Sequence, residues 1–197
     1  FCDFISKYGS SPDDRKTVSA INNKGENIKI SLDGNNTVIQ IFKTISESHI
    51  GDLSLFRVYS GEVKTGDDLF NTNRNSSERM GQLFILNGKN RTQVDCISAG
   101  DIGAVVKLKD THTGNTLCSS DNVKLPKLKL PNSNIHSAIS STTKGEEEKL
   151  AIGLSTLHEE DPTFIYRVDN EIKQTIISGQ GELHLQVSTE RLKRRFN

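Results

Sequence analysis

The sequence predicts a mostly β-stranded domain followed by an α+β domain, and three observations predict this division. Residues 37–125 contain short apolar runs with turn signals about every ten residues, which is typical of a closed or sandwiched all-β domain. Residues 135–197 alternate strand and helix patterns. Between them, residues 126–134 contain two prolines and the run Asn132-Ser133-Asn134, which indicates a short linker.

The composition of the 197 residues limits the class of protein. The formal net charge is +0, so the whole chain does not attract nucleic acid and any RNA contact must be local. The three cysteines are widely spaced without a CxxC pair, which favours a reducing cytoplasm. No apolar run approaches the ~20 residues of a membrane helix, so we expect no membrane partner. The sequence begins at Phe1 rather than Met, which suggests a fragment or a processed chain.

Residues 1–36 carry little periodicity. We expect a loop over residues 6–14, which are rich in Ser, Gly, Pro and Asp. Residues 22–36 are rich in Asn, Lys, Gly and Asp and include a turn signal at Asp33–Gly34. This first part therefore reads as a connector with two short strands.

Apolar residues define the strands expected within residues 37–125. Residues 38–42 open the first run, and in residues 53–59 apolar residues occur in both alternating sets, so both faces should be partly covered. The apolar residues 83–86 precede Asn87–Gly88, a strong hairpin signal. Another strand is expected over residues 102–106, with turns at residues 64–67 and 112–115.

Residues 135–197 predict the order strand, helix, strand, strand, helix. After a first strand over residues 135–140, residues 143–146 (Thr-Lys-Gly-Glu) fit a capping box. The helix ends at residues 159–164, because Pro162 disfavours helix at the residue before it and cannot continue the helix. Its buried stripe is Leu150, Leu154 and Leu157, and strands over residues 164–168 and 173–178 follow.

This βαββα order is one strand short of a ferredoxin-like βαββαβ domain. The missing strand would cover the edge of the first strand. We therefore expect residues 135–140 to be an exposed sheet edge, which favours self-association of the truncated domain.

The last helix follows two glycines, Gly179 and Gly181, which allow a tight change of direction after the strand. The helix has apolar residues on two faces, which predicts a partner besides its own sheet. One face carries Leu185, Leu192 and Phe196, and the other carries Leu183 and Val187.

Six stretches of the chain carry recognisable motifs: FRVYSG (56–61), AGDIGAVV (99–106), TGNTLC (113–118), EDPTF (160–164), QTIISGQGELHL (174–185) and ERLKRRF (190–196). In these stretches the chain resembles the elongation factor G family of translational GTPases. Gln180 stands where the family pattern has Met, and Gln186 where it has Glu. The resemblance implies a translation-factor β-barrel, the second domain, over residues 37–125. It implies a truncated ferredoxin-like (βαββα) third domain over residues 135–197, and a connector from a missing GTPase domain over residues 1–36.

The resemblance also implies a role on the ribosome. The whole protein would bind GTP and Mg²⁺, hydrolyse GTP and promote translocation. This chain would be a non-catalytic part that docks on small-subunit rRNA and proteins and contacts its own GTPase domain. The sequence holds no GxxxxGK[ST] phosphate loop, because Gly88–Lys89 lacks a glycine five residues earlier. We accordingly expect no catalytic, cofactor-binding or metal-binding residue in this chain.

The candidate rRNA contacts lie in the β-rich part of the chain. Arg79, Lys89 and Arg91 flank the expected hairpin at Asn87, and Lys43 lies near the start of the domain. Cations at a loop tip neutralise phosphates and make binding salt-dependent. The resemblance implies that this hairpin contacts rRNA, although Asn87 stands where the family hairpin has His. An ordinary solvated surface is the alternative reading of these residues.

The resemblance implies a second group of contacts, with the GTPase domain. These candidates are Asp161, Pro162, Thr163, Phe164, Gly179 and Gly181. Residues 161–164 also read as a helix stop followed by a core Phe, and the two readings are compatible. At the end of the last helix, Lys193, Arg194 and Arg195 either face RNA or complement the helix dipole.

Other chemistries find little support. The Gly179-x-Gly181 pair lacks the third glycine of a dinucleotide fingerprint, because residue 184 is His. The five histidines show no HxxxH spacing. Residues 140–145 lack the Arg that an acylphosphatase needs after its first strand. The acidic runs 146–148 and 159–161 fit helix ends better than paired catalytic carboxylates.

Two alternatives stay open at this point. A tetracycline-resistance ribosome-protection protein, or another paralogue, has the same modules. From a different class, a standalone RNA-binding or scaffold module would have no GTPase partner.

Overall fold

The computed structural model describes residues 1–47, 51–120, 123–141 and 145–196. It divides into two compact units, which are described separately. The first consists of Phe1–Lys43 and Glu47–Lys127, and the second of Thr44–Ser46 and Leu128–Asn197. The predicted fold class, mostly β followed by α+β, is confirmed.

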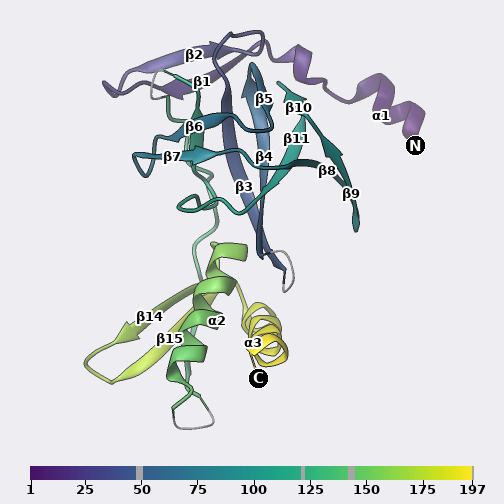
Figure 1. Cartoon of the computed structure of the whole chain (residues 1–197). Coiled ribbons are helices and arrows are strands. Elements are labelled where there is room, and N and C mark those ends of the chain that lie inside the picture. The colour runs from purple at the N-terminus through teal and green to yellow at the C-terminus, as the bar shows by residue number, and fades with distance from the viewer. Residues whose placement is uncertain (48–50, 121–122, 142–144, 197) are drawn as a thin grey trace. The chain divides into compact units, whose positions relative to one another are not determined.

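The first unit is a β-barrel preceded by a short helix and a hairpin (Figure 1). Eight strands form one sheet in the order β7-β6-β12-β3-β4-β11-β8-β9. Strands β5 and β10 form a separate two-stranded pair, which the bonds from Thr65 N to Asp95 O (3.0 Å) and from Ala99 N to Gly61 O (2.9 Å) extend at its two ends. The elements are α1 (Cys2–Tyr8), a 3-10 helix (Pro12–Asp14), β1 (Thr17–Ile21), β2 (Asn27–Ser31), β3 (Val38–Glu47), β4 (Gly51–Ser60), β5 (Glu62–Lys64), β6 (Asp68–Asn71), β7 (Ser76–Arg79), β8 (Leu83–Asn87), β9 (Asn90–Val94), β10 (Cys96–Ser98), β11 (Ile102–Val106) and β12 (Thr116–Cys118).

Strand β4 shows how the barrel core is built. Phe56 and Val58 are fully buried on its inner face, whereas Leu55, Arg57 and Tyr59 on the other face are half-buried. The expectation that both faces of this strand are partly covered is therefore confirmed. The other buried members of the barrel core are Ile39, Ile41, Val63, Leu69, Met80, Leu83, Ile97, Val105 and Leu117.

The two short strands expected in residues 1–36 are present as β1 and β2, which form an antiparallel hairpin. It packs on the barrel, because Ala20 of β1 is buried in one cluster with Val38 and Cys118. Ile21 N also donates to Lys124 O (2.8 Å). This hairpin is therefore part of the first unit's packing.

Helix α1 is a correction to the sequence-based expectation. Residues 6–8, expected in a loop, belong to this helix, and only Pro12–Asp14 form the expected turn-like structure. The helix buries none of its side chains, and Phe4, Ile5 and Tyr8 are exposed. Its seven residues are too few for the helical period to stand out in the sequence.

The second unit is a three-stranded antiparallel sheet with two helices that pack on each other and on the sheet (Figure 1). The strand order is β13-β15-β14. The elements are β13 (Ile135–Ile139), α2 (Glu147–Glu160), β14 (Ile165–Asp169), β15 (Gln174–Gly179) and α3 (Glu182–Phe196). Within the described residues β13 pairs with β15 alone, so the expected sheet edge is confirmed. Self-association through this edge stays a prediction.

The helices bury the stripes that the sequence predicts. Leu154 and Leu157 of α2 and Leu185 and Leu192 of α3 are buried in one core with Phe164. The predicted second face of α3 is solvent-exposed within this unit. Its two residues, Leu183 and Val187, are 72% and 39% exposed.

The predicted capping box at the start of α2 is wrong in its position. The helix begins at Glu147, with Glu146 at the N-cap and no side-chain capping bond from it. Glu147 Oε2 instead accepts from Gly145 N (2.9 Å), so the carboxylate that reaches back comes from the next residue. Thr143, the other half of the expected box, lies outside the described residues.

Candidate RNA-contact and domain-contact surfaces

The β8–β9 hairpin brings together three of the five candidate rRNA contacts. Asn87 and Lys89 are exposed at its tip, and Arg91 is half-buried on β9. Residues 83–94 contain no acidic residue, so Lys89 and Arg91 give the hairpin a local positive charge. An acid-free hairpin rich in amide side chains can bind phosphates and base edges.

The turn of this hairpin lies one residue later than the sequence predicts. Asn87 pairs with Asn90, so the two-residue turn is Gly88–Lys89 rather than Asn87–Gly88. Gly88 has φ 61°, and glycine at the first turn position is the arrangement of a type II′ turn. The shift places the Lys89 ammonium at the extreme tip, where an extended ligand can reach it.

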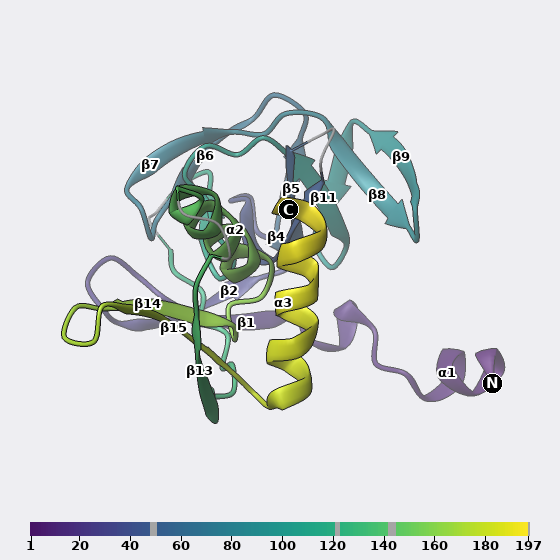
Figure 2. The same ribbon diagram turned by 90° about the horizontal axis from the view of Figure 1, so that it is seen from below.

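The structure does not bring Arg79 and Lys43 to the hairpin. Arg79 is exposed on β7, the opposite edge of the eight-stranded sheet, and Lys43 is exposed on β3 within that sheet. The two views place β7 and the hairpin on opposite sides of the barrel (Figures 1 and 2). The five candidates therefore do not form one surface.

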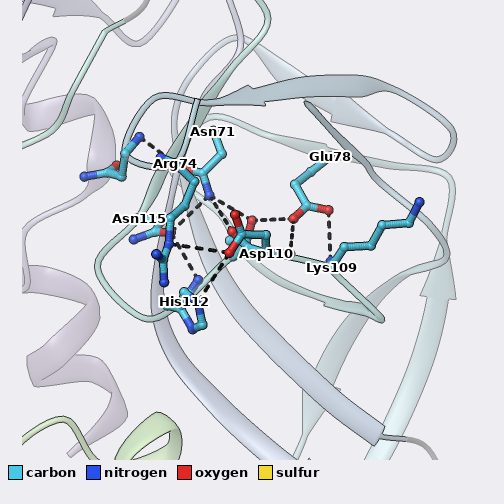
Figure 3. Close-up of polar contacts among 9 residues, drawn as sticks. Asn71, Arg74, Glu78, Lys109, Asp110, His112 and Asn115 are labelled. Carbon is cyan, nitrogen blue, oxygen red and sulfur yellow. Dashed lines mark hydrogen bonds and ion pairs between the residues drawn. The ribbon is translucent and has the colours of Figure 1, made fainter. Parts of the chain in front are cut away.

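A polar network that the sequence analysis missed holds the loop between β11 and β12 (Figure 3). Glu78 of β7 is only 2% exposed. Its Oε1 accepts from Asp110 N (2.7 Å) and Thr111 Oγ1 (2.9 Å), and its Oε2 accepts from Lys109 N (3.0 Å). The carboxylate satisfies three donors of the loop at once, so it fixes the loop against β7.

Asn71 completes this network from β6. It is fully buried, and its Nδ2 donates to Asp110 O (3.3 Å) and Asn115 Oδ1 (3.0 Å). On the surface, Asp110 Oδ1 lies 3.6 Å from Arg74 Nε and 3.7 Å from His112 Nε2. The loop is thus held by buried hydrogen bonds, and its surface Asp110 carboxylate pairs with Arg74, so the network gives the barrel no second positively charged surface.

In the second unit, the turn after α2 is organised by the side chain of Asp161. Its Oδ1 accepts from Thr163 N (2.9 Å) and Thr163 Oγ1 (2.6 Å), and its Oδ2 lies 3.1 Å from His184 Nε2. Phe164 follows with 1% exposure, and its carbonyl bonds to His158 Nδ1 (2.7 Å). Phe164 is therefore a core residue, as one interpretation of residues 161–164 predicts. The hydrogen-bonded turn before it is compatible with the other interpretation, a contact with the GTPase domain, which stays a prediction.

The Asp161 bonds also shift its titration. Partial burial by itself raises the pKa of the carboxyl, but the bonds from Thr163 and the proximity of His184 outweigh it, so the pKa lies below its ordinary value of 3.8. A folded-state pKa below the unfolded one stabilises the fold above the unfolded pKa. That contribution is lost as pH falls through the folded-state pKa.

We therefore expect wild type and Asp161→Asn to differ in the acid dependence of stability of the second unit. The wild type should lose an extra stabilising contribution as the pH falls below the ordinary carboxyl pKa and through the lower folded-state pKa, and Asp161→Asn should not. Urea unfolding across this pH range, followed by amide signals of α2 and β15, measures it. Asp3→Asn in exposed α1 is the control, and identical pH profiles for wild type and Asp161→Asn would contradict the assignment.

Gly179 and Gly181 serve different purposes at the start of α3. A Cβ on Gly179 would lie 2.8 Å from Leu185 Cδ2 and 2.9 Å from His184 Nδ1, so a side chain here would force Leu185 and His184 to move. A Cβ on Gly181 would meet nothing within 4 Å, so the expected steric need for glycine is wrong there. Neither glycine has a positive φ, and the close approach at Gly179 lets the His184 ring sit beside the strand.

A groove of about 340 Å³ lies between the Asp161 turn and α3. Leu183, Val187 and Arg191 line its α3 side, and Glu160, Asp161 and Phe164 are among the residues opposite. The mixture of exposed apolar and charged side chains suits a protein surface or an amphipathic ligand.

The basic end of α3 is only partly available for RNA. Arg195 Nη1 bonds to Glu160 Oε1 (2.8 Å), and this pair ties α3 to the end of α2. Lys193 and Arg194 are exposed in the last turn, where the helix dipole favours cations. RNA contact by these two residues stays a prediction.

Among the described residues, no group of three or more His, Cys, Asp and Glu side chains could hold a metal ion. No helix in the described ranges is long and apolar enough to cross a membrane.

Each of the two units matches a different domain of a known protein family. Residues 36–120 match the family model of elongation factor G domain 2, and residues 130–197 match the model of elongation factor G, domain III. A crystal structure of a protein from Thermus thermophilus is similar over 98% of this chain, with a TM-score of 0.77 and 26% sequence identity. This chain spans 27% of the length of that protein.

Proposed function

This chain belongs to the elongation factor G family, of which it carries domain 2 and domain III, and from that premise we propose that it docks a translational GTPase on the ribosome. Domains 2 and III are non-catalytic parts of such a GTPase. In the proposal, the barrel contacts small-subunit rRNA in the cytoplasm. GTP and Mg²⁺ binding belong to a GTPase domain of the intact protein.

The observation that carries the docking role is the charge of the β8–β9 hairpin. Lys89 stands at the tip of a turn, Arg91 follows on β9, and residues 83–94 contain no acidic residue. Because the whole chain has a net charge of +0, this local charge is the feature that supports an RNA contact. Arg79 and Lys43 belong to other parts of the barrel, so we leave them out of the primary contact.

The second unit supports a coupling role. The rigid Asp161–Phe164 turn and the exposed face of α3 border the same groove, which provides a surface for the GTPase domain. The proposal is that the second unit transmits the nucleotide state of that domain to the barrel. GTP hydrolysis by the purified chain would contradict the non-catalytic assignment.

Co-sedimentation with ribosomes across a salt series tests the docking role. We expect salt-sensitive binding that a full-length elongation factor G displaces. The double variant Lys89→Ala/Arg91→Ala should bind about tenfold more weakly and lower the slope of log K against log salt by about 1–2. The matched control, Lys24→Ala/Lys29→Ala on the exposed β1–β2 hairpin, removes the same charge and should bind like wild type. Equal weakening by both double variants, or no binding at low salt, would contradict docking through the β8–β9 hairpin.

A further inference from the structure

Gln180, between β15 and α3, ties the start of α3 to the segment that leads into β13. Its side-chain Nε2 donates to Asn132 O (2.9 Å) and Pro131 O (3.2 Å). Next to it, Asn134 N donates to Gly179 O (2.8 Å). A methionine, which the family pattern has at this position, has no N–H to make the first two bonds. The amide of Gln180 therefore clamps the start of α3 to the backbone of residues 131 and 132.

The backbone of Gln180 continues the chain of bonds towards the groove. Gln180 N donates to His184 Nδ1 (3.1 Å), so Nδ1 is the unprotonated nitrogen of the neutral ring. The proton therefore lies on Nε2, which faces Asp161 Oδ2 at 3.1 Å. One imidazole thus joins the strand-to-helix turn to the turn after α2, and its tautomer is set by the Gln180 amide.

The far end of the chain of bonds is the Asp161 turn. The other oxygen of Asp161 accepts both bonds from Thr163, and Phe164 N donates to Asp161 O (2.9 Å). The Phe164 ring also packs edge-on against His184, with centroids 6.2 Å apart. Moving the imidazole would therefore change the hydrogen bonds of this turn and the packing of its core residue.

We propose that Gln180 and His184 form a positioning relay, through which the placement of residues 131–134 sets the conformation of the Asp161–Phe164 turn. Both ends lie in the second unit, and His184 is the side chain whose ring nitrogens lie against both Gln180 N and Asp161 Oδ2. The existence of the relay does not depend on ribosome docking. We expect the relay to transmit a change in residues 131–134 to the groove beside the Asp161–Phe164 turn, where the GTPase domain would bind. This role rests on the proposed function.

The substitution Gln180→Met in the full 197-residue chain tests the relay. It removes the two side-chain bonds and keeps the backbone amide, and it installs the residue of the family pattern. Hydrogen exchange reports the amides of Asn134 and Thr163, and imidazole ¹⁵N chemical shifts report the tautomer of His184. We expect Asn134 to exchange about tenfold faster, Thr163 to exchange severalfold faster, and the Nε2–H tautomer of His184 to lose population.

A control variant and a variant at the other end of the relay complete the test. Gln186→Met makes the same chemical change at an exposed position of α3 and should leave all three signals unchanged. Thr163→Val removes the hydroxyl bond at the other end and should speed Asn134 exchange, because coupling between two sites is reciprocal. Faster Asn134 exchange in Gln180→Met, with Thr163 and His184 unchanged, would overturn the relay. Unchanged Asn134 exchange in Thr163→Val would do the same. Neither measurement involves ribosomes, so these failures are distinguishable from a failure of docking.

Discussion

Replacing Phe164 by alanine is expected to destabilise the second unit by about 3–5 kcal/mol, the usual cost of truncating a buried Phe. The ring is 1% exposed and lies in the core formed by α2, α3 and β15. Domains are stable by only about 5–15 kcal/mol, so this change should leave the second unit largely or partly unfolded. The barrel has a separate core, and its stability should not change.

Residue-resolved hydrogen exchange distinguishes the two units in this experiment. Amides of Leu154 and Ile177 report the second unit, and those of Val58 and Leu117 report the barrel. Phe4→Ala is the matched control, since that ring is 64% exposed on α1. A loss of less than about 1 kcal/mol in the second unit would contradict the core assignment of Phe164.

The same variant also separates the two proposed roles. If the barrel carries docking, the Phe164→Ala chain should still co-sediment with ribosomes in a salt-sensitive manner, although its second unit is unfolded. Loss of binding together with loss of the second unit would move the docking role out of the barrel.

Apolar periodicity predicted the elements that have one clearly buried face. The stripes of α2 and α3 are examples, because burial of a contiguous apolar stripe is the main source of stability for such elements. Polar elements gave no such signal. Strand β7 has the sequence Ser-Ser-Glu-Arg, and its buried member is Glu78, which a pattern based on apolar burial cannot find.

Register and long-range pairing limited the prediction of the sites. The Asn87–Gly88 signal predicted the β8–β9 hairpin, but the cross-strand pairing of Asn87 with Asn90 moved the turn by one residue. Asp161 was a candidate residue but His184 was not, because the contact between them depends on how α3 packs against the end of α2. Likewise, the side-chain bonds from Gln180 join α3 to a segment whose spacing in sequence carries no signal.

Glu78→Ala should have the largest effect on the barrel, about 3–5 kcal/mol. It would leave Lys109 N, Asp110 N and Thr111 Oγ1 without the acceptor that the buried Glu78 side chain, 2% exposed, provides. Each unsatisfied buried donor costs about 1–3 kcal/mol, less whatever water or loop movement recovers. Barrel-specific hydrogen exchange and denaturant unfolding measure the loss.

Glu78→Gln separates the hydrogen bonds from the volume of the side chain. A Gln carbonyl at the Oε1 position can still accept from Asp110 N and Thr111 Oγ1, but its NH₂ group would then face Lys109 N, donor against donor. We therefore expect an intermediate loss of about 1–3 kcal/mol, with the loop amides around Lys109 exchanging faster than the barrel core. Ser77→Ala, on the exposed position beside Glu78 in β7, is the control and should change little.

The outcomes of this pair of variants decide what Glu78 contributes. Equal losses for Gln and Ala would mean that the Lys109 bond dominates the network. No loss for either would refute the role of Glu78 in fixing the loop. The placement of Asp110 beside Arg74 and His112 would then need another explanation, because in the structure the loop that carries Asp110 is held by the Glu78 carboxylate.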